Sequence, residues 1–368
     1  MVAAAVIGAI VYGVLYKSPQ RKAFEAALAQ ARQGQAAAQM QVAQAYLAGE
    51  VITPDVSQAV AWYQKAAAQG DGAAAYELAQ LYLTGEKLER DIDSGVSYLK
   101  LAAAKNYAPT QYALGRLYQT GTENLPEHLG QAAWWWIKAS AQNDPDAQAA
   151  LEQLQSENPG LVDRVKQLVE LEQKAQSEVN AETLVLAEAY QNGDALEKND
   201  EQAEAWYKKL ADSNVPQAQY ALYQWYMVPT RLDELKALEY LQKAAEGADA
   251  RAQYEVGDRI YQMAQNPEEY QIAFRWFDLA AQQNHAGGLY MRGIMQMQGQ
   301  GTAKNIRAAM SSFKQAAELG HADAQYVLGQ SYYRGIGVKA NRNEARRWLQ
   351  QARDNGNEQA AALLTQMH

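Results

Sequence analysis

The sequence predicts an all-α protein built from about eight tandem helix pairs. Two observations indicate this fold class: glycine and tyrosine recur every 36 residues, and each period contains two amphipathic helical segments. Gly49, Gly85 and Gly121 follow one another at this spacing, and so do Tyr254 and Tyr290. Each repeat therefore encodes the same supersecondary structure.

The two helices of a repeat end differently. The first ends at a glycine, which tolerates the left-handed conformation of a helix cap. The second ends in a short segment such as KAAAQGD, KAAEGAD or QAAELGH. We place the repeats at residues 36–71, 72–107, 108–144, 179–215, 216–249, 250–285, 286–321 and 322–357.

These repeats resemble a known family. The segment ADAQYVLGQSYYRGIGVKANRNEARRWLQQARDNG, which begins at Ala322, fits the pattern A-x-x-x-L-G-x-x-Y-x-x-G-x-G followed by A-x-x-W-x-x-x-A-A-x-x-G. This pattern resembles that of the Sel-one-like repeat (SLR) family, whose members are related to tetratricopeptide repeats. The resemblance extends from Ala36 to the C-terminus, except for residues 145–178. It implies a right-handed αα-superhelical solenoid that binds other proteins, and it implies no reaction.

Composition excludes several other classes of function. The chain has 42 acidic and 33 basic residues, a net charge of −9, which argues against a nucleic-acid-binding protein. It has no cysteine, so thiolate zinc sites, disulfides and thiol nucleophiles are excluded. Two of its four histidines, His285 and His321, fall at the turn between repeats, where other repeats have aspartate. With no catalytic motif in the sequence, we predict no enzyme, no cofactor and no metal.

The N-terminus suggests a membrane anchor. Residues 2–16 carry no charge and are followed by Lys17, Arg21 and Lys22. We interpret residues 1–22 as a hydrophobic anchor or uncleaved signal; a buried N-terminal helix is the alternative. The resulting expectation is a single-pass protein of the bacterial inner membrane with a periplasmic body. Positive charge after the segment would instead favour a cytoplasmic body.

The repeat period breaks once. After Pro159 and Gly160 comes a charged amphipathic helix that lacks the repeat markers. We therefore predict an N-terminal array at residues 23–160, a joint helix at residues 161–178 and a C-terminal array with a terminal capping helix at residues 179–368. The sequence leaves open whether the joint is a rigid bend or a hinge.

Three consecutive tryptophans, residues 134–136, cannot all face one side of a helix, because neighbouring side chains point about 100° apart. Trp135 and Trp136 align with two columns of large apolar residues that we assign to the core between repeats. Trp134 aligns with a column that is polar or small elsewhere, so it either covers the irregular segment that follows or forms a secondary exposed patch for a partner.

The first helices are expected to line a concave surface in the C-terminal array. We place partner-binding residues along a stripe at i, i+4 and i+7, with a solvated groove wall as the alternative. Three nearby residues differ from the type that other repeats have at the same position: Tyr223 replaces a small residue, Arg292 a leucine and Gln296 a tyrosine. Arg292 and Gln296 either hydrogen-bond to each other or bind a ligand. The candidate residues are Tyr223, Trp225, Arg259, Met291, Arg292, Met295, Gln296 and Arg334.

The predicted function is a non-enzymatic scaffold or adaptor for protein–protein interaction, tethered to the membrane through residues 2–16. Its partner would be a component of a secretion or envelope-assembly machine, or a toxic effector that an immunity protein neutralises. The alternative is a glycan- or cell-wall-binding module that uses exposed aromatic side chains.

Overall fold

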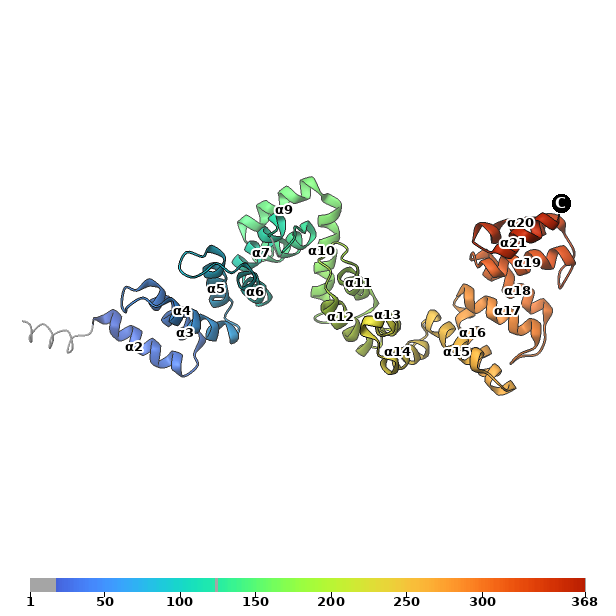
Figure 1. Ribbon diagram of the computed structural model, residues 1–368, viewed down its shortest axis with the longest axis horizontal. Helices are drawn as coiled ribbons and strands as arrows, with labels where there is room; N and C mark the ends of the chain where they lie inside the picture. Colours follow the sequence, from blue (N-terminus) through green and yellow to red (C-terminus); the bar gives the residue numbers. More distant parts are fainter. Residues whose placement is uncertain (1–17, 123–124, 368) are drawn as a thin grey trace, which may run out of the picture. The chain divides into compact units, whose positions relative to one another are not determined.

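The computed structural model describes residues 18–122 and 125–367. The chain forms α-helices that follow one another in pairs, joined by short loops (Figure 1). The helices are α2 (Pro19–Arg32), α3 (Ala36–Ala48), α4 (Val56–Ala68), α5 (Gly72–Thr84), α6 (Ile92–Ala104), α7 (Ala108–Thr120), α8 (Leu129–Ser140), α9 (Pro145–Glu157), α10 (Pro159–Lys174), α11 (Leu184–Asn192), α12 (Asp200–Asp212), α13 (Pro216–Met227), α14 (Glu234–Glu246), α15 (Ala250–Met263), α16 (Pro267–Gln282), α17 (Ala286–Gln298), α18 (Ile306–Glu318), α19 (Ala322–Arg334), α20 (Arg342–Asp354) and α21 (Glu358–Gln366), with two 3-10 turns, η1 (Ala181–Thr183) and η2 (Pro229–Arg231).

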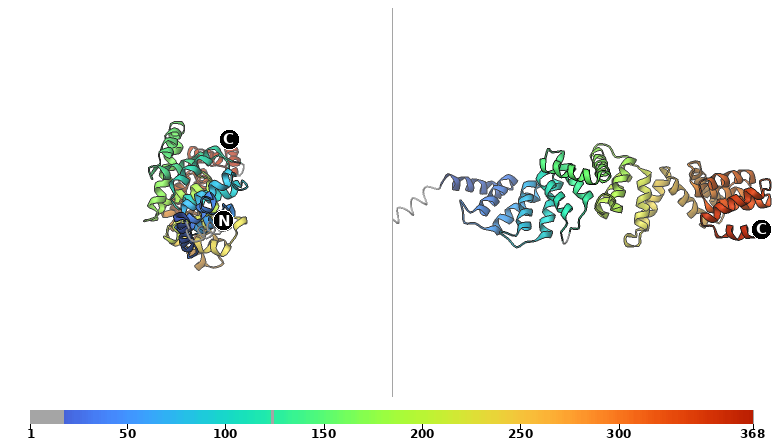
Figure 2. Two further views of the ribbon diagram at one scale, coloured as in Figure 1. Left: turned by 90° about the vertical axis from the view of Figure 1, so that its left-hand side faces the viewer. Right: turned by 90° about the horizontal axis from the view of Figure 1, so that it is seen from above.

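The helices divide into two compact units. Within the described residues, unit 1 contains residues 18–173 and 192–199, and unit 2 contains residues 174–191 and 200–367. Within each unit the pairs succeed one another in sequence order, as in an α-solenoid (Figure 2). The all-α helix pairs predicted from the sequence are confirmed. The array boundaries at residues 160 and 178 and the handedness stay predictions.

One core column matches the sequence alignment closely. Its members are exposed by 2% or less, and they come from the second helix of each pair: Tyr63, Leu99, Trp136, Tyr207, Leu241, Phe277 and Leu349. Opposite this column the first helix carries alanine or glycine, except in α13, which carries Tyr223. A Cβ atom added to Gly115 would lie 2.4 Å from Nε1 of Trp136, so α7 and α8 approach closely only because Gly115 has no side chain.

The tryptophan triplet is arranged differently from the prediction. Trp134 is 2% exposed and Trp136 is fully buried, whereas Trp135 is only half-buried. Nζ of Lys138 lies 4.6 Å from the Trp134 ring centroid and forms an ion pair with Glu172 of α10. The irregular segment after α8 therefore covers Trp134, and the predicted exposed patch at this residue is wrong.

A recurrent glutamine connects successive helix pairs. Buried glutamines near the start of the first helices donate from Nε2 to a backbone carbonyl at the end of the preceding second helix; Gln253, for example, donates to Ala245 over 3.2 Å. The Oε1 atom of Gln253 accepts a hydrogen bond from Nε2 of Gln283, which lies at the end of the pair formed by α15 and α16. We call this arrangement the glutamine clamp. It recurs at Gln39 with Gln69, at Gln111 with Gln142 and at Gln325 with Asn355. The clamp adds a second hydrogen bond to helix-end carbonyls, each of which also accepts from a backbone N–H group three residues later.

No helix in the described part of the chain is long and apolar enough to cross a membrane. This finding overturns the expectation of a single-pass inner-membrane protein. The apolar segment on which that expectation rested, residues 2–16, lies outside the described residues.

His285 and His321 act as N-caps of α17 and α19. The backbone N–H groups of Gly288 and Ala324 donate to their Nδ1 atoms over 3.1 and 3.3 Å. Burial lowers the pKa of both imidazoles, although Asp249 near His285 and Asp323 near His321 oppose that shift. A neutral ring is also required for Nδ1 to accept a hydrogen bond.

We expect unit 2 to lose stability as the pH falls below about 6.5, the usual pKa of histidine. The folded pKa is lowered, so the unfolded chain binds protons first and the contribution to stability is complete only above that pH. Thermal melting between pH 8 and 5 checks this. The double variant His285→Asn and His321→Asn should flatten the dependence, because Asn357 already caps α21 as a neutral residue. An unchanged pH profile in that variant would assign the effect to other groups.

Candidate functional site

Unit 1 contains an open groove of about 630 Å³ on the face formed by its first helices. It runs from α5 across α7 to the start of α9. The lining residues are Tyr76, Gln80, Leu83, Leu99, Pro109, Tyr112, Ala113, Arg116, Leu117, Thr120, Asp144 and Asp146. We call this site the unit 1 groove.

Helical spacing places these side chains together. Tyr76, Gln80 and Leu83 are four and three residues apart on α5, so they lie on one face of that helix. Tyr112 and Arg116 occupy the equivalent positions of α7, 36 residues later. The groove is therefore a product of the repeat period, and its walls rest on the buried core behind α5 and α7.

The groove combines aromatic, cationic and acidic groups. The Tyr76 and Tyr107 rings lie 5.8 Å apart. Burial is the largest cause that raises the pKa of Tyr76, and the nearby Tyr107 and Glu77 raise it further. The phenol of Tyr76 therefore stays neutral. Arg116 is exposed and forms no ion pair with the described residues. At the far end, Oδ1 of Asp144 accepts from the backbone of Ala147 over 2.9 Å and caps α9. The surface offers apolar contact together with an available guanidinium group.

Two of the candidate residues on the stripe predicted in the C-terminal array, Trp225 and Met295, are buried in the interior of unit 2. Trp225 is 3% exposed, with the guanidinium carbon of Arg231 3.7 Å from its ring centroid and the Tyr207 ring 6.1 Å away. Met295 is fully buried, and Met291 packs beside it against Phe277. These side chains fill space between helix pairs, which corrects their placement in a groove.

Tyr223 and Arg259 contact each other across neighbouring pairs. Tyr223 is 8% exposed, and its hydroxyl accepts a hydrogen bond from Nη2 of Arg259 over 3.2 Å. The tyrosine replaces the small residue of its column, and the half-buried arginine occupies the position that Trp225 fills one repeat earlier. The hydrogen bond between Tyr223 and Arg259 thus gives each of these unusual side chains a partner within unit 2.

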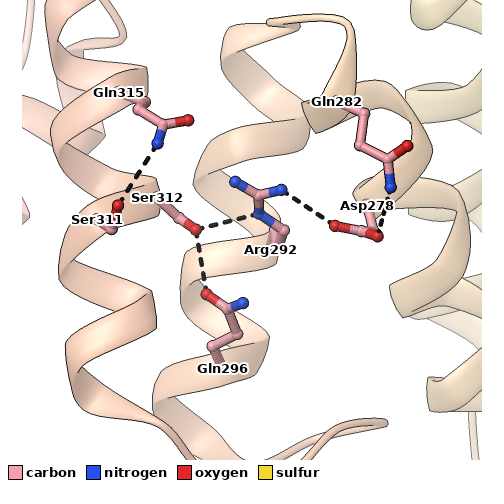
Figure 3. Close-up of polar contacts among 7 residues, drawn as sticks. All are labelled: Asp278, Gln282, Arg292, Gln296, Ser311, Ser312 and Gln315. Carbon is pink, nitrogen blue, oxygen red and sulfur yellow. Dashed lines mark hydrogen bonds and ion pairs between the residues drawn. The ribbon is translucent and has the colours of Figure 1, made fainter.

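Arg292 and Gln296 belong to a polar network that joins three helices (Figure 3). Nη1 of Arg292 donates to Asp278 on α16 over 3.0 Å, and its Nε donates to Oγ of Ser312 on α18 over 3.1 Å. The Ser312 hydroxyl in turn donates to Oε1 of Gln296 over 3.1 Å. The side chains of Arg292 and Gln296 therefore have hydrogen-bond partners within the protein and need no ligand.

Of the eight candidate partner-binding residues, only Arg334 is exposed.

The groove that the structure shows was missed because the predicted stripe is shifted by one residue. On α5 the positions that correspond to this stripe begin at Glu77, whereas the groove is lined by Tyr76, and one residue turns a helix by about 100°. The signal was present in the sequence. Tyrosine recurs at the groove position of six repeats, namely Tyr76, Tyr112, Tyr220, Tyr254, Tyr290 and Tyr326.

No group of three or more histidine, aspartate or glutamate side chains within residues 18–122 and 125–367 is arranged to hold a metal ion.

Comparison with solved structures finds other repeat proteins. The chain is 24% identical to a protective antigen of uropathogenic Escherichia coli with an SLR fold, over 94% of this chain and 90% of that one, with a TM-score of 0.33. It is 23% identical to a Sel1 repeat protein from Oxalobacter formigenes, over 94% and 80% of the two chains, with a TM-score of 0.31. An immunity protein from Pseudomonas aeruginosa is 14% identical over 93% and 84%, with a TM-score of 0.20. No curated protein matches the chain.

The family model of the Sel1 repeat matches the chain eight times. The matched segments are residues 36–71, 72–107, 108–144, 184–215, 216–249, 250–285, 286–321 and 322–357. Sel1 repeat proteins generally mediate protein–protein interaction, and the family is typically a non-enzymatic interaction scaffold. The chain belongs to the Sel1 repeat family.

Proposed function

We propose that the protein is a non-enzymatic adaptor that binds a segment of a partner protein in the unit 1 groove. The observation that carries this proposal is the open groove itself, in which Arg116 stands beside two half-buried tyrosines. Tyrosine and arginine are the residue types that most often dominate protein interfaces.

The form of the groove favours a peptide segment over a small molecule. Small-molecule sites enclose most of their ligand, whereas this surface is open and extends over two successive first helices. Its side chains come from rigid helices, so little ordering is needed on binding. An extended segment with an acidic side chain near Arg116 and an apolar one near Tyr76 and Leu83 fits this arrangement.

The partner that we propose is a component of a secretion or envelope-assembly machine, or a toxic effector neutralised by this protein as an immunity factor. The two roles differ in the expected strength of binding. Neutralising a toxin requires one tight, long-lived complex, whereas a scaffold works with weaker, exchanging contacts.

Arg116→Glu tests the groove. The side chain is exposed, so the substitution should change stability by less than about 0.5 kcal/mol, while reversing the charge should weaken partner binding at least tenfold. The measurement is capture of proteins from the source cells on the full chain, followed by quantitative mass spectrometry and by affinity measurement with the purified partner. Arg32→Glu, an exposed arginine at the end of α2, is the matched control.

Two outcomes count against the proposal. Equal capture by the wild type and Arg116→Glu would remove the groove from partner binding. Retention of a polysaccharide, with no protein lost in the variant, would favour the glycan-binding alternative.

A further inference from the structure

The loop inside each helix pair normally covers the pair before it. In unit 2, the loop between α19 and α20 lies on the first turn of α18, where a Cβ on Gly337 would come within 2.6 Å of Ile306 and 2.8 Å of Met310. Likewise, the loop between α17 and α18 lies on the first turn of α16, and a Cβ on Gly301 would fall 2.2 Å from the Tyr270 carbonyl oxygen. Met310 is only 5% exposed under its loop.

One pair lacks this covering loop. Seven residues separate α17 from α18 and α19 from α20, but only Ala264, Gln265 and Asn266 separate α15 from α16. α15 continues to Met263. At the equivalent position, α17 and α19 have already ended, and the first loop glycine, Gly299 or Gly335, follows. α16 also begins three residues earlier than α18 and α20, relative to the repeat period.

The preceding second helix, α14, has an apolar start without a covering loop. Leu238 is 43% exposed at the position where Met310 is buried in α18, and Leu235, which corresponds to the exposed Arg307 of α18, is 84% exposed. Leu232, just before α14, is 54% exposed, and Met263 is 70% exposed. We call Leu232, Leu235 and Leu238 the α14 patch.

Two cations near the patch are paired with carboxylates. Lys236 contacts Asp233 over 2.8 Å, and Arg231 contacts Asp200 over 2.9 Å. Because these two cations already have partners, a ligand here would be recognised mainly by apolar burial and backbone shape.

We propose that the α14 patch is a docking site for a short, extended aliphatic segment of a partner protein, which takes the place of the missing loop. The covering loops define the chemistry of this segment. The loop on α18 reads Gly-Ile-Gly-Val from Gly335; its Val338 packs against the cluster of Met310 and Phe313, whereas Ile336 is 41% exposed. In unit 1, Leu196 of the corresponding loop is fully buried. An aliphatic residue flanked by small residues therefore fits, because small residues let the two backbones approach. This surface is separate from the unit 1 groove.

The test uses the full chain with isotope-labelled leucine methyl groups and the acetylated, amidated heptapeptide Gly-Ile-Gly-Val-Lys-Ala-Asn, the sequence of residues 335–341. We expect saturable shifts of the Leu235 and Leu238 methyl signals, at least tenfold weaker binding to Leu235→Asp, and little change between low and high salt. The peptide with aspartate at its isoleucine and valine positions should not bind.

Matched variants establish whether binding is specific to the α14 patch. Leu319→Asp, at a leucine that is 51% exposed at the opposite end of its pair, should bind the peptide normally, and so should Arg116→Glu, which tests only the groove. Circular dichroism confirms that Leu235→Asp is folded. Absence of saturable shifts, or equal binding by Leu235→Asp, would overturn the proposal. Self-association of the wild type that Leu235→Asp abolishes would also overturn it, by making a second copy the occupant.

Discussion

Replacing Trp136 by alanine is expected to lower the free energy of unfolding of unit 1 by about 3–5 kcal/mol, the usual cost of truncating a buried tryptophan. The ring is fully buried against Gly115, and its Nε1 donates to the Tyr112 carbonyl over 3.3 Å. Truncation leaves a cavity between α7 and α8 and a carbonyl without this donor. Urea unfolding followed by circular dichroism measures the loss.

Trp135→Ala is the internal control. The side chain is half-buried, and its Nε1 has no hydrogen-bond partner among the described residues, so its removal costs less than that of Trp136. Equal losses in the two variants would contradict the assignment of Trp136, rather than its neighbour, to the core column.

Gly115→Ala should also destabilise unit 1, by about 1–3 kcal/mol, the range for overpacking a core. Alanine is the better helix former by about 1 kcal/mol, but here its methyl group would meet the rigid indole ring at 2.4 Å and the Ala132 carbonyl oxygen at 3.1 Å. The steric cost therefore exceeds the gain in helix propensity.

Gly160→Ala isolates that helix propensity. Gly160 lies in the first turn of α10, and a Cβ there would have no neighbour within 4 Å. The same substitution should leave unit 1 unchanged or slightly more stable. If thermal melting showed stabilisation by both alanines, the close approach of α7 and α8 would not be the reason for the glycine at residue 115.

The repeat period predicted most of the fold, because each repeat buries the same positions. Columns such as that of Tyr63, Leu99 and Phe277 follow from spacing alone, since large apolar residues at a fixed period must meet small ones on the neighbouring helix. The alignment failed only where one residue of register decides which side chain is buried. Lys138, which lies over the Trp134 ring, pairs with Glu172 of α10, a helix outside the repeats with no counterpart in the alignment.

The functional surface was harder to predict for the same reason. A groove position and an interior position are adjacent in sequence, so variability among repeats did not distinguish Trp225, in the interior, from Arg116, in the groove. Polar residues in core columns were also ambiguous. Arg292 is satisfied by Asp278 and Ser312 from neighbouring helices, and no local pattern predicts partners 14 and 20 residues away.

Because of the glutamine clamp, a helix pair could be duplicated or removed without loss of the connection between its neighbours. Each clamp carries its own pair of amides 30 or 31 residues apart and bonds a backbone carbonyl of the preceding pair, which no substitution can remove. The clamp of Gln111 and Gln142 also bonds the Asn106 side chain of that pair. A duplicated repeat would thus arrive with its connector complete, and arrays could lengthen or shorten during evolution without changes in their neighbours. In two pairs without the clamp both positions differ, as Ala75 with Lys105 and Leu289 with Leu319. Gln219 keeps its bond to the Ala211 carbonyl, although Gly247 stands at the second position.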